Sequence, residues 1–134
     1  IKIRQQMRQK FSTAMLLKPS EVSVPSSQQI FLERLASIIE EHIDDENFSV
    51  ENLGMEVGMS RSQIHRKLRA ITNQSASEFI RNFRLQRAAE LITQDAGNIA
   101  EIAYMVGFSS QAYFTNCFQR AFGCSPSEFK KRHR

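Results

Sequence analysis

The sequence predicts an all-α protein, with two helix-turn-helix subdomains joined by a long central helix and about seven helices in total. Three observations predict this fold class. Apolar residues recur three to four positions apart, and no segment alternates as a strand would. N-capping sequences precede one apolar segment after another. Finally, a pattern that begins Gly-apolar-Ser and ends Ser-Glu-Phe occurs twice, at 58–79 and at 107–129.

Residues 1–27 are expected to be a linker or N-terminal arm from a larger protein. Five Lys or Arg and no acid occur in residues 1–18, and two prolines and four serines follow in residues 18–28. The second stretch has the composition of a linker, and the apolar spacing of the first is compatible with an amphipathic helix. Because the chain begins with Ile1 rather than Met, we expect it to be a piece of a longer protein.

The first subdomain is predicted at residues 28–77, with three helices. Ser49 is placed to cap a short helix that Gly58 ends, and Ser60 with Gln63 forms a capping box for the next helix. The expected inward residues of that helix are Ile64, Leu68 and Ile71. The first helix, at 28–43, is expected to have an apolar face made of Ile30, Phe31, Leu35, Ile38, Ile39 and His42.

A central helix at 78–93 is predicted to lead into the second subdomain at 94–134. The helix starts are marked by Ser75-Ala-Ser-Glu78, Asn98-Ile-Ala-Glu101, either Ser109 or Ser110, and Ser125-Pro-Ser-Glu128. Gly107 and Gly123 are expected to end the helices that precede them. The aromatic residues at helical spacing are expected to form core rather than a base-stacking platform: Phe79, Phe83, Phe108, Phe114, Phe118, Phe122 and Phe129.

The repeated pattern predicts two helix-turn-helix motifs. Leu53, Gly54, Val57, Gly58 and Ser60 recur forty-nine residues later as Ile102, Ala103, Val106, Gly107 and Ser109. In each copy the small residue lets two helices approach closely, and the glycine supplies a tight turn between them. The second helix of such a motif enters the DNA major groove. We therefore expect recognition helices at about 61–71 and 110–121, inserted into successive major grooves.

The charge of the chain is unevenly distributed. Its formal net charge of +4 divides into −3 for residues 1–60 and +7 for residues 61–134. A basic half favours a polyanionic partner, although a solvated basic surface would have the same composition. The acidic stretch EEHIDDEN at 40–47 would repel DNA, and it is a candidate surface for RNA polymerase or a second copy of the chain.

The two repeats carry a specific family resemblance. The segments IAEIAYMVGFSSQAYFTNCFQRAFGCSPSEFK (99–130) and FSVENLGMEVGMSRSQIHRKLRAITNQSASEFIR (48–81) resemble the DNA-binding domain of AraC-type transcription regulators. The resemblance covers about residues 30–131 and departs at a turn, where Gln74 and Ala76 replace the usual Gly and Pro. The stretch at 16–35 is similar to the segment that joins a receiver domain to an AraC-type output domain in hybrid two-component regulators.

In the first recognition helix, the outward basic and polar residues are the candidate DNA contacts. They are Ser60, Arg61, Ser62, His65, Arg66, Lys67 and Arg69. The resemblance implies that Ser62, His65 and Arg66 point at base edges. It also implies phosphate contacts for Ser60, Arg61 and Arg69. Arginine suits guanine because its fork matches O6 and N7.

The second recognition helix is nearly neutral, and its candidates are Ser110, Gln111, Ala112, Tyr113 and Asn116. The resemblance implies that the last four of these face the groove. Gln and Asn can pair with adenine, and Ala can contact a thymine methyl. On the central helix, Arg81, Arg84 and Arg87 either reach the DNA backbone or pair with Glu78 and Glu90; the sequence leaves both readings open.

Other classes of protein lack their signatures here. His42, His65 and His133 have no spaced nucleophile or carboxylate, and Cys117 and Cys124 lack zinc-ligand spacing. We therefore expect no enzyme activity, catalytic residue, metal or cofactor. Duplex RNA is disfavoured because its major groove is too narrow for a helix. The alternative function is a helical protein-interaction module with only non-specific DNA affinity.

The expected partner is therefore double-stranded operator DNA, together with RNA polymerase. The resemblance to hybrid regulators implies that the signal arrives from upstream domains, which would also form a homodimer. No membrane contact is expected of this segment, because its apolar runs are too short to span a bilayer. The expected localisation is cytoplasmic, including the case of the cytoplasmic part of a membrane-anchored hybrid sensor.

Overall fold

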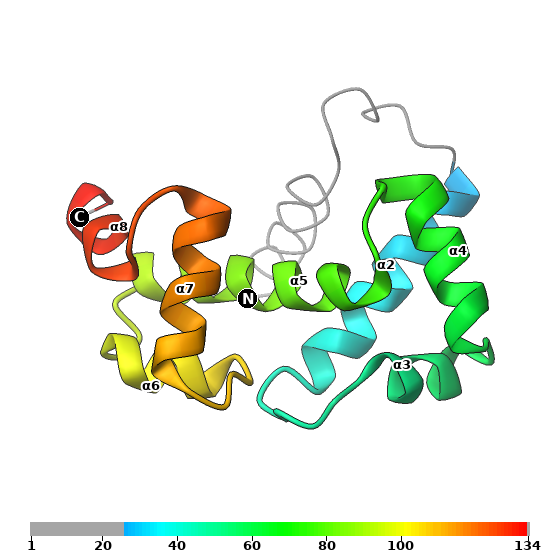
Figure 1. Ribbon diagram of the computed structural model, residues 1–134, viewed down its shortest axis with the longest axis horizontal. Coiled ribbons are helices and arrows are strands. Elements are labelled where there is room, and N and C mark those ends of the chain that lie inside the picture. Colours follow the sequence, from blue (N-terminus) through cyan, green and yellow to red (C-terminus); the bar gives the residue numbers. More distant parts are fainter. Residues whose placement is uncertain (1–25, 134) are drawn as a thin grey trace. The chain divides into compact units, whose positions relative to one another are not determined.

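The computed structural model describes residues 26–133, which form helices and connecting turns without a strand (Figure 1). The helices are α2 (Ser26–Glu41), α3 (Val50–Val57), α4 (Arg61–Thr72), α5 (Ala76–Thr93), α6 (Ile99–Met105), α7 (Gln111–Phe122) and α8 (Pro126–Arg132). The all-α prediction is confirmed. Residues 1–25, where we predicted the arm and an amphipathic stretch, lie outside the described residues.

The chain forms two compact units. Within the described residues, the first unit comprises the chain up to His42 together with Phe48–Phe83. The second unit comprises Ile43–Asn47 and the chain from Arg84 onward. Helix α5 therefore contributes its first half to one unit and its second half to the other.

The core of the first unit begins on α2. Its buried residues are Leu32, Leu35, Ala36, Ile38 and Ile39. The predicted apolar face was wrong at Ile30, whose exposed fraction is 64%. At 100° per residue, position 30 lies almost opposite Leu32, so a helix that buries Leu32 turns Ile30 to solvent. Phe31 is half-buried, and the ammonium of Lys67 lies over its ring, 4.3 Å from the ring centroid.

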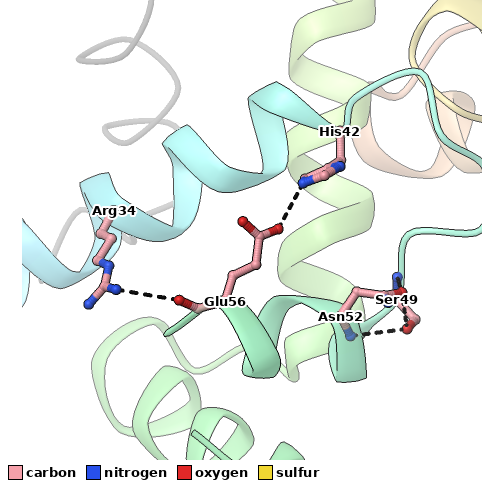
Figure 2. Close-up of polar contacts among 5 residues, drawn as sticks. All are labelled: Arg34, His42, Ser49, Asn52 and Glu56. Atoms are coloured by element: carbon pink, nitrogen blue, oxygen red, sulfur yellow. Dashed lines mark hydrogen bonds and ion pairs between the residues drawn. The ribbon is translucent and has the colours of Figure 1, made fainter. Parts of the chain in front are cut away.

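Polar contacts connect α2 to α3, as Figure 2 shows. Nε2 of His42 lies 2.7 Å from a carboxylate oxygen of Glu56, and Nη2 of Arg34 donates to the backbone carbonyl of Glu56 at 3.4 Å. The ring of His42 also stacks on Phe48, with centroids 4.6 Å apart. His42, predicted as part of the apolar face, is half-buried. The face of its ring packs on Phe48, and its Nε2 contacts Glu56.

The predicted caps are present at the helix starts. Ser49 caps α3 in a reciprocal pair with Asn52, and Ser60 and Asn98 form capping boxes with Gln63 and Glu101. At α5, Ser75 Oγ accepts from the Glu78 amide at 3.1 Å, and Glu78 Oε1 accepts from the Ser75 amide at 3.0 Å. This bond to the Ser75 backbone amide is the main reason that the pKa of Glu78 is lowered. Ser110, rather than Ser109, caps α7.

Aromatic rings fill the core of the second unit, as predicted. The fully buried ring of Phe118 packs against those of Phe114, Phe122 and Phe129, with centroids 5.7, 4.5 and 5.3 Å away. Phe108 meets Phe114 edge-on at 5.2 Å. This cluster packs α7 and α8 together and buries one face of α7, so the opposite face of α7 remains available to solvent.

Arg84 is buried, contrary to both readings of the sequence. Its Nη1 donates to the carbonyls of Val106 at 2.7 Å and Ile43 at 2.8 Å, and its Nη2 donates to the carbonyl of Asp45 at 2.9 Å. Desolvation lowers the pKa of its guanidinium, and the nearby carboxylate of Asp45 raises it in opposition. Because its donors are committed to backbone carbonyls, Arg84 is a structural residue of the second unit rather than a DNA contact.

Candidate nucleic-acid interface

The first helix-turn-helix is formed by α3 and α4. Gly58 ends α3 in the left-handed conformation, with φ of 71°. The amide of Met59 then donates to the carbonyl of Gly54 at 2.9 Å, which closes the turn. A Cβ on Gly54 would lie 2.4 Å from the carbonyl oxygen of Met59. The close approach that we predicted at Gly54 is therefore an approach of the turn's own backbone to α3.

The second helix-turn-helix, formed by α6 and α7, repeats this closure. The amide of Phe108 donates to the carbonyl of Ala103 at 3.0 Å, forty-nine residues after the bond between Met59 and Gly54. Gly107 takes the left-handed conformation, with φ of 86°. Thus both copies of the sequence pattern fold into the same turn, and each turn leads into a twelve-residue helix.

Helix α4 presents its predicted contacts to solvent. It runs from Arg61 to Thr72, one residue beyond the predicted 61–71, and it buries Ile64, Leu68, Ile71 and Thr72. All seven predicted contact residues of this helix and its cap are exposed: Ser60, Arg61, Ser62, His65, Arg66, Lys67 and Arg69. The inward and outward faces therefore divide as the apolar spacing predicted.

The cationic side chains of α4 differ in their surroundings. Arg61 Nη1 lies 2.5 Å from Oε1 of Glu51, in the first turn of α3, whereas Lys67 lies over Phe31. Arg66 has no ion-pair partner among residues 26–133. The pKa of Glu51 is lowered, first by a hydrogen bond from its own backbone amide and then by Arg61. Sequence analysis missed Glu51, because a separation of ten residues across a turn carries no periodic signal.

Helix α7 begins one residue later than predicted and runs from Gln111 to Phe122, compared with 110–121. Its candidates Ser110, Gln111, Ala112, Tyr113 and Asn116 are all exposed. Tyr113 is 51% exposed, and its ring rests at a tilt on Phe108 with centroids 5.6 Å apart. This contact limits the directions that the phenol can take. The helix carries one charged side chain, Arg120 in its last turn.

A polar cluster lies elsewhere in the first unit. Glu41, His42 and Glu56 bring one potential ligand atom each to within 4.8 Å of one another, a grouping that the sequence did not reveal. Within it, His42 and Glu56 make the contact drawn in Figure 2. In the described part of the chain, no helix combines the length and apolarity needed to cross a bilayer.

Two helix-turn-helix motifs with exposed second helices define a class of protein, the DNA-binding domains that contain a duplicated helix-turn-helix motif. A family model described as a helix-turn-helix domain matches residues 53–132. A solved transcriptional regulator from Chromobacterium violaceum, described as containing an AraC-type DNA-binding domain, has a TM-score of 0.73 and 28% identity, covering 81% of this chain and 96% of that one. The chain belongs to the AraC-type helix-turn-helix family, a family of DNA-binding domains of transcription regulators rather than of enzymes.

Two further relatives place the domain in context. The DNA-binding domain of AdpA, a global transcriptional factor solved in complex with a target DNA, has a TM-score of 0.69 and 26% identity, covering 77% of this chain and 92% of that one. Histidine kinase P4 of Formosa agariphila is 38% identical over 130 residues, which is 97% of this chain. The chain spans only 10% of the length of that kinase.

Proposed function

We propose that this chain is the output domain of a transcription regulator and binds a specific duplex DNA site through α4 and α7. The observation that carries the proposal is the duplication itself. Two helices fifty residues apart follow turns closed by the same backbone bond, and each exposes polar side chains at the positions that a recognition helix uses. Entry of the helices into successive major grooves would read two blocks of sequence about one helical turn, or ~34 Å, apart.

The two helices have different proposed roles. Helix α4 holds four Lys or Arg and no acid, so it would supply most of the phosphate contacts and the salt dependence of binding. Arg66 is exposed and without an ion-pair partner among residues 26–133, which leaves its fork free for a guanine edge. On α7, Gln111 and Asn116 would read adenines by hydrogen bonds, with little electrostatic contribution.

We further propose that the domain ends a signalling chain. The support is the similarity of nearly the whole chain to a short part of a histidine kinase, which is the relation expected of an output domain in a hybrid two-component regulator. In that arrangement the signal and a homodimer interface would come from other domains of the full protein. RNA polymerase is the proposed partner on DNA, and the domain would lie on the cytoplasmic side of any membrane anchor.

The test is selection of binding sites from random duplexes, followed by titration of the selected site with variants. Arg66→Ala should weaken binding by about 1–3 kcal/mol and relax the base preference in one block. Asn116→Ala should relax the other block. Arg69→Ala is the matched control: as a phosphate contact it should weaken all duplexes equally and reduce the salt slope by about 0.9.

Two results would contradict the proposal. If no site is enriched and binding merely fades with salt, the chain is a helical module with only non-specific DNA affinity. If both Arg66→Ala and Asn116→Ala relax the same block, the two helices do not read separate grooves.

A further inference from the structure

Arg61 lies exposed at the start of the first recognition helix. It is the first residue of α4, directly after the cap Ser60, and its side chain is 62% exposed. Helix N-termini attract phosphate through their free amides and their dipole. A guanidinium at this position would therefore be expected to bind a DNA phosphate.

In the free protein, however, this guanidinium already has an anionic partner. Nη1 of Arg61 lies 2.5 Å from Oε1 of Glu51, which stands on the neighbouring helix α3 and is itself 56% exposed. A phosphate that approaches Arg61 must displace this carboxylate or share the guanidinium with it. In either case the carboxylate repels the phosphate, because two like charges are brought close together.

We propose that Glu51 competes with DNA phosphate for Arg61 and so lowers the affinity of the first recognition helix for duplex DNA. This inference rests on the function proposed above and deepens it, since it assigns a role to a residue that does not itself read a base. The competition is confined to one cation. Arg66 has no ion-pair partner among residues 26–133 and keeps its full capacity to contact DNA.

The ionisation of Glu51 agrees with this role. Its pKa is lowered by its own backbone amide at the start of α3 and by Arg61, so the carboxylate is charged at neutral pH. The competing charge is therefore permanent under the conditions in which the protein would bind DNA, and pH changes near neutrality should not remove it.

Glu51→Gln is the direct test. The variant should bind duplex DNA about two- to fivefold more tightly at low salt, the range that corresponds to an exposed ion pair. Because Arg61 can then bind a phosphate without a competitor, the slope of log affinity against log salt should steepen by up to about 0.9. Both quantities come from anisotropy titrations of the full chain at several salt concentrations.

The control is Glu56→Gln, which removes the same charge from the same helix. The partner of Glu56 is His42 rather than Arg61, so its effect on binding should be smaller. Glu51→Gln is also tested in an Arg61→Ala background, where its effect should fall to that of Glu56→Gln, because only the general repulsion between carboxylate and phosphate remains. If Glu51→Gln leaves binding unchanged or weakens it, Glu51 does not compete. If it tightens binding equally in the Arg61→Ala background, only long-range charge is involved.

The design separates this inference from the proposed function. If the wild-type chain prefers a selected duplex over a scrambled one, and Glu51→Gln binds both as the wild type does, only the competition is refuted. If the wild-type chain shows no such preference, the proposed function fails, whatever Glu51→Gln does. Thermal melting of each variant checks that the first turn of α3 tolerates the loss of an acid.

Discussion

Replacing Gly107 by alanine is expected to destabilise the second unit by more than about 3 kcal/mol, a large part of the roughly 5–15 kcal/mol that stabilises a typical domain. The φ of 86° at this position costs an L-residue about 1 kcal/mol by itself. The new Cβ would also lie 1.4 Å from Nη1 of Arg84 and 2.5 Å from the carbonyl oxygen of Ile43. The guanidinium cannot move away without abandoning its three carbonyl acceptors.

Urea denaturation followed by circular dichroism measures this loss. Gly123→Ala is the matched control, because Gly123 also has a positive φ, of 77°, but no atom lies within 4 Å of its Cβ position. The free energy of unfolding of this variant should fall by only about 1 kcal/mol, the cost of placing an L-residue at a positive φ. Equal losses for the two variants would show that the space beside Gly107 is not filled as described.

Arg84→Met is expected to have the second large effect. Methionine keeps much of the side-chain volume but removes the donors to the carbonyls of Val106, Ile43 and Asp45. The bond to Val106 is buried, so its carbonyl left without a donor costs about 1–3 kcal/mol, whereas the part-buried carbonyls of Ile43 and Asp45 can partly turn to water and cost less. Relief of the desolvated charge offsets part of the total. We expect a net loss of about 3 kcal/mol in the free energy of unfolding.

The same denaturation assay measures this change, and Arg81→Met serves as its control. Arg81 is half-buried on the same helix and donates no hydrogen bond to the residues that the structure describes. Arg81→Met should therefore lower the free energy of unfolding by less than about 1 kcal/mol. Coupling gives a sharper check. In an Arg84→Ala background, Gly107→Ala should cost clearly less than in the wild type, because the guanidinium is gone and only the carbonyl oxygen of Ile43 still lies close to the new Cβ. If the free-energy changes of Gly107→Ala and Arg84→Ala were strictly additive, the guanidinium of Arg84 would not lie beside Gly107.

Sequence reasoning was most successful where the information is local. A cap acts on an amide only three residues away, so Ser49, Ser60, Ser75 and Asn98 could be assigned from their neighbours. The exposed faces of α4 and α7 followed in the same way, because apolar residues three and four apart fix which side of a helix is buried.

The failures concern contacts between distant parts of the chain. Arg84 meets the carbonyl of Ile43 across forty-one residues, and no periodicity marks a backbone carbonyl as an acceptor. Glu51 and Arg61 are brought together by the turn at Gly58, which neither side chain encodes. Ile30 was assigned inward because it is apolar, whereas the packing of Leu32 decides the rotation of α2.

The unequal charge of the two recognition helices has a kinetic consequence. In the proposed complex, the cations of α4 attract the duplex from a distance, whereas α7, with Arg120 as its one charged side chain, acts only at contact range. Changes on α4 should therefore alter the association rate and its response to salt. Changes at Asn116 should alter the residence time instead. Contacts of α4 would stabilise the first complex formed with DNA. The lifetime of the final complex would depend on whether α7 meets the bases that it recognises.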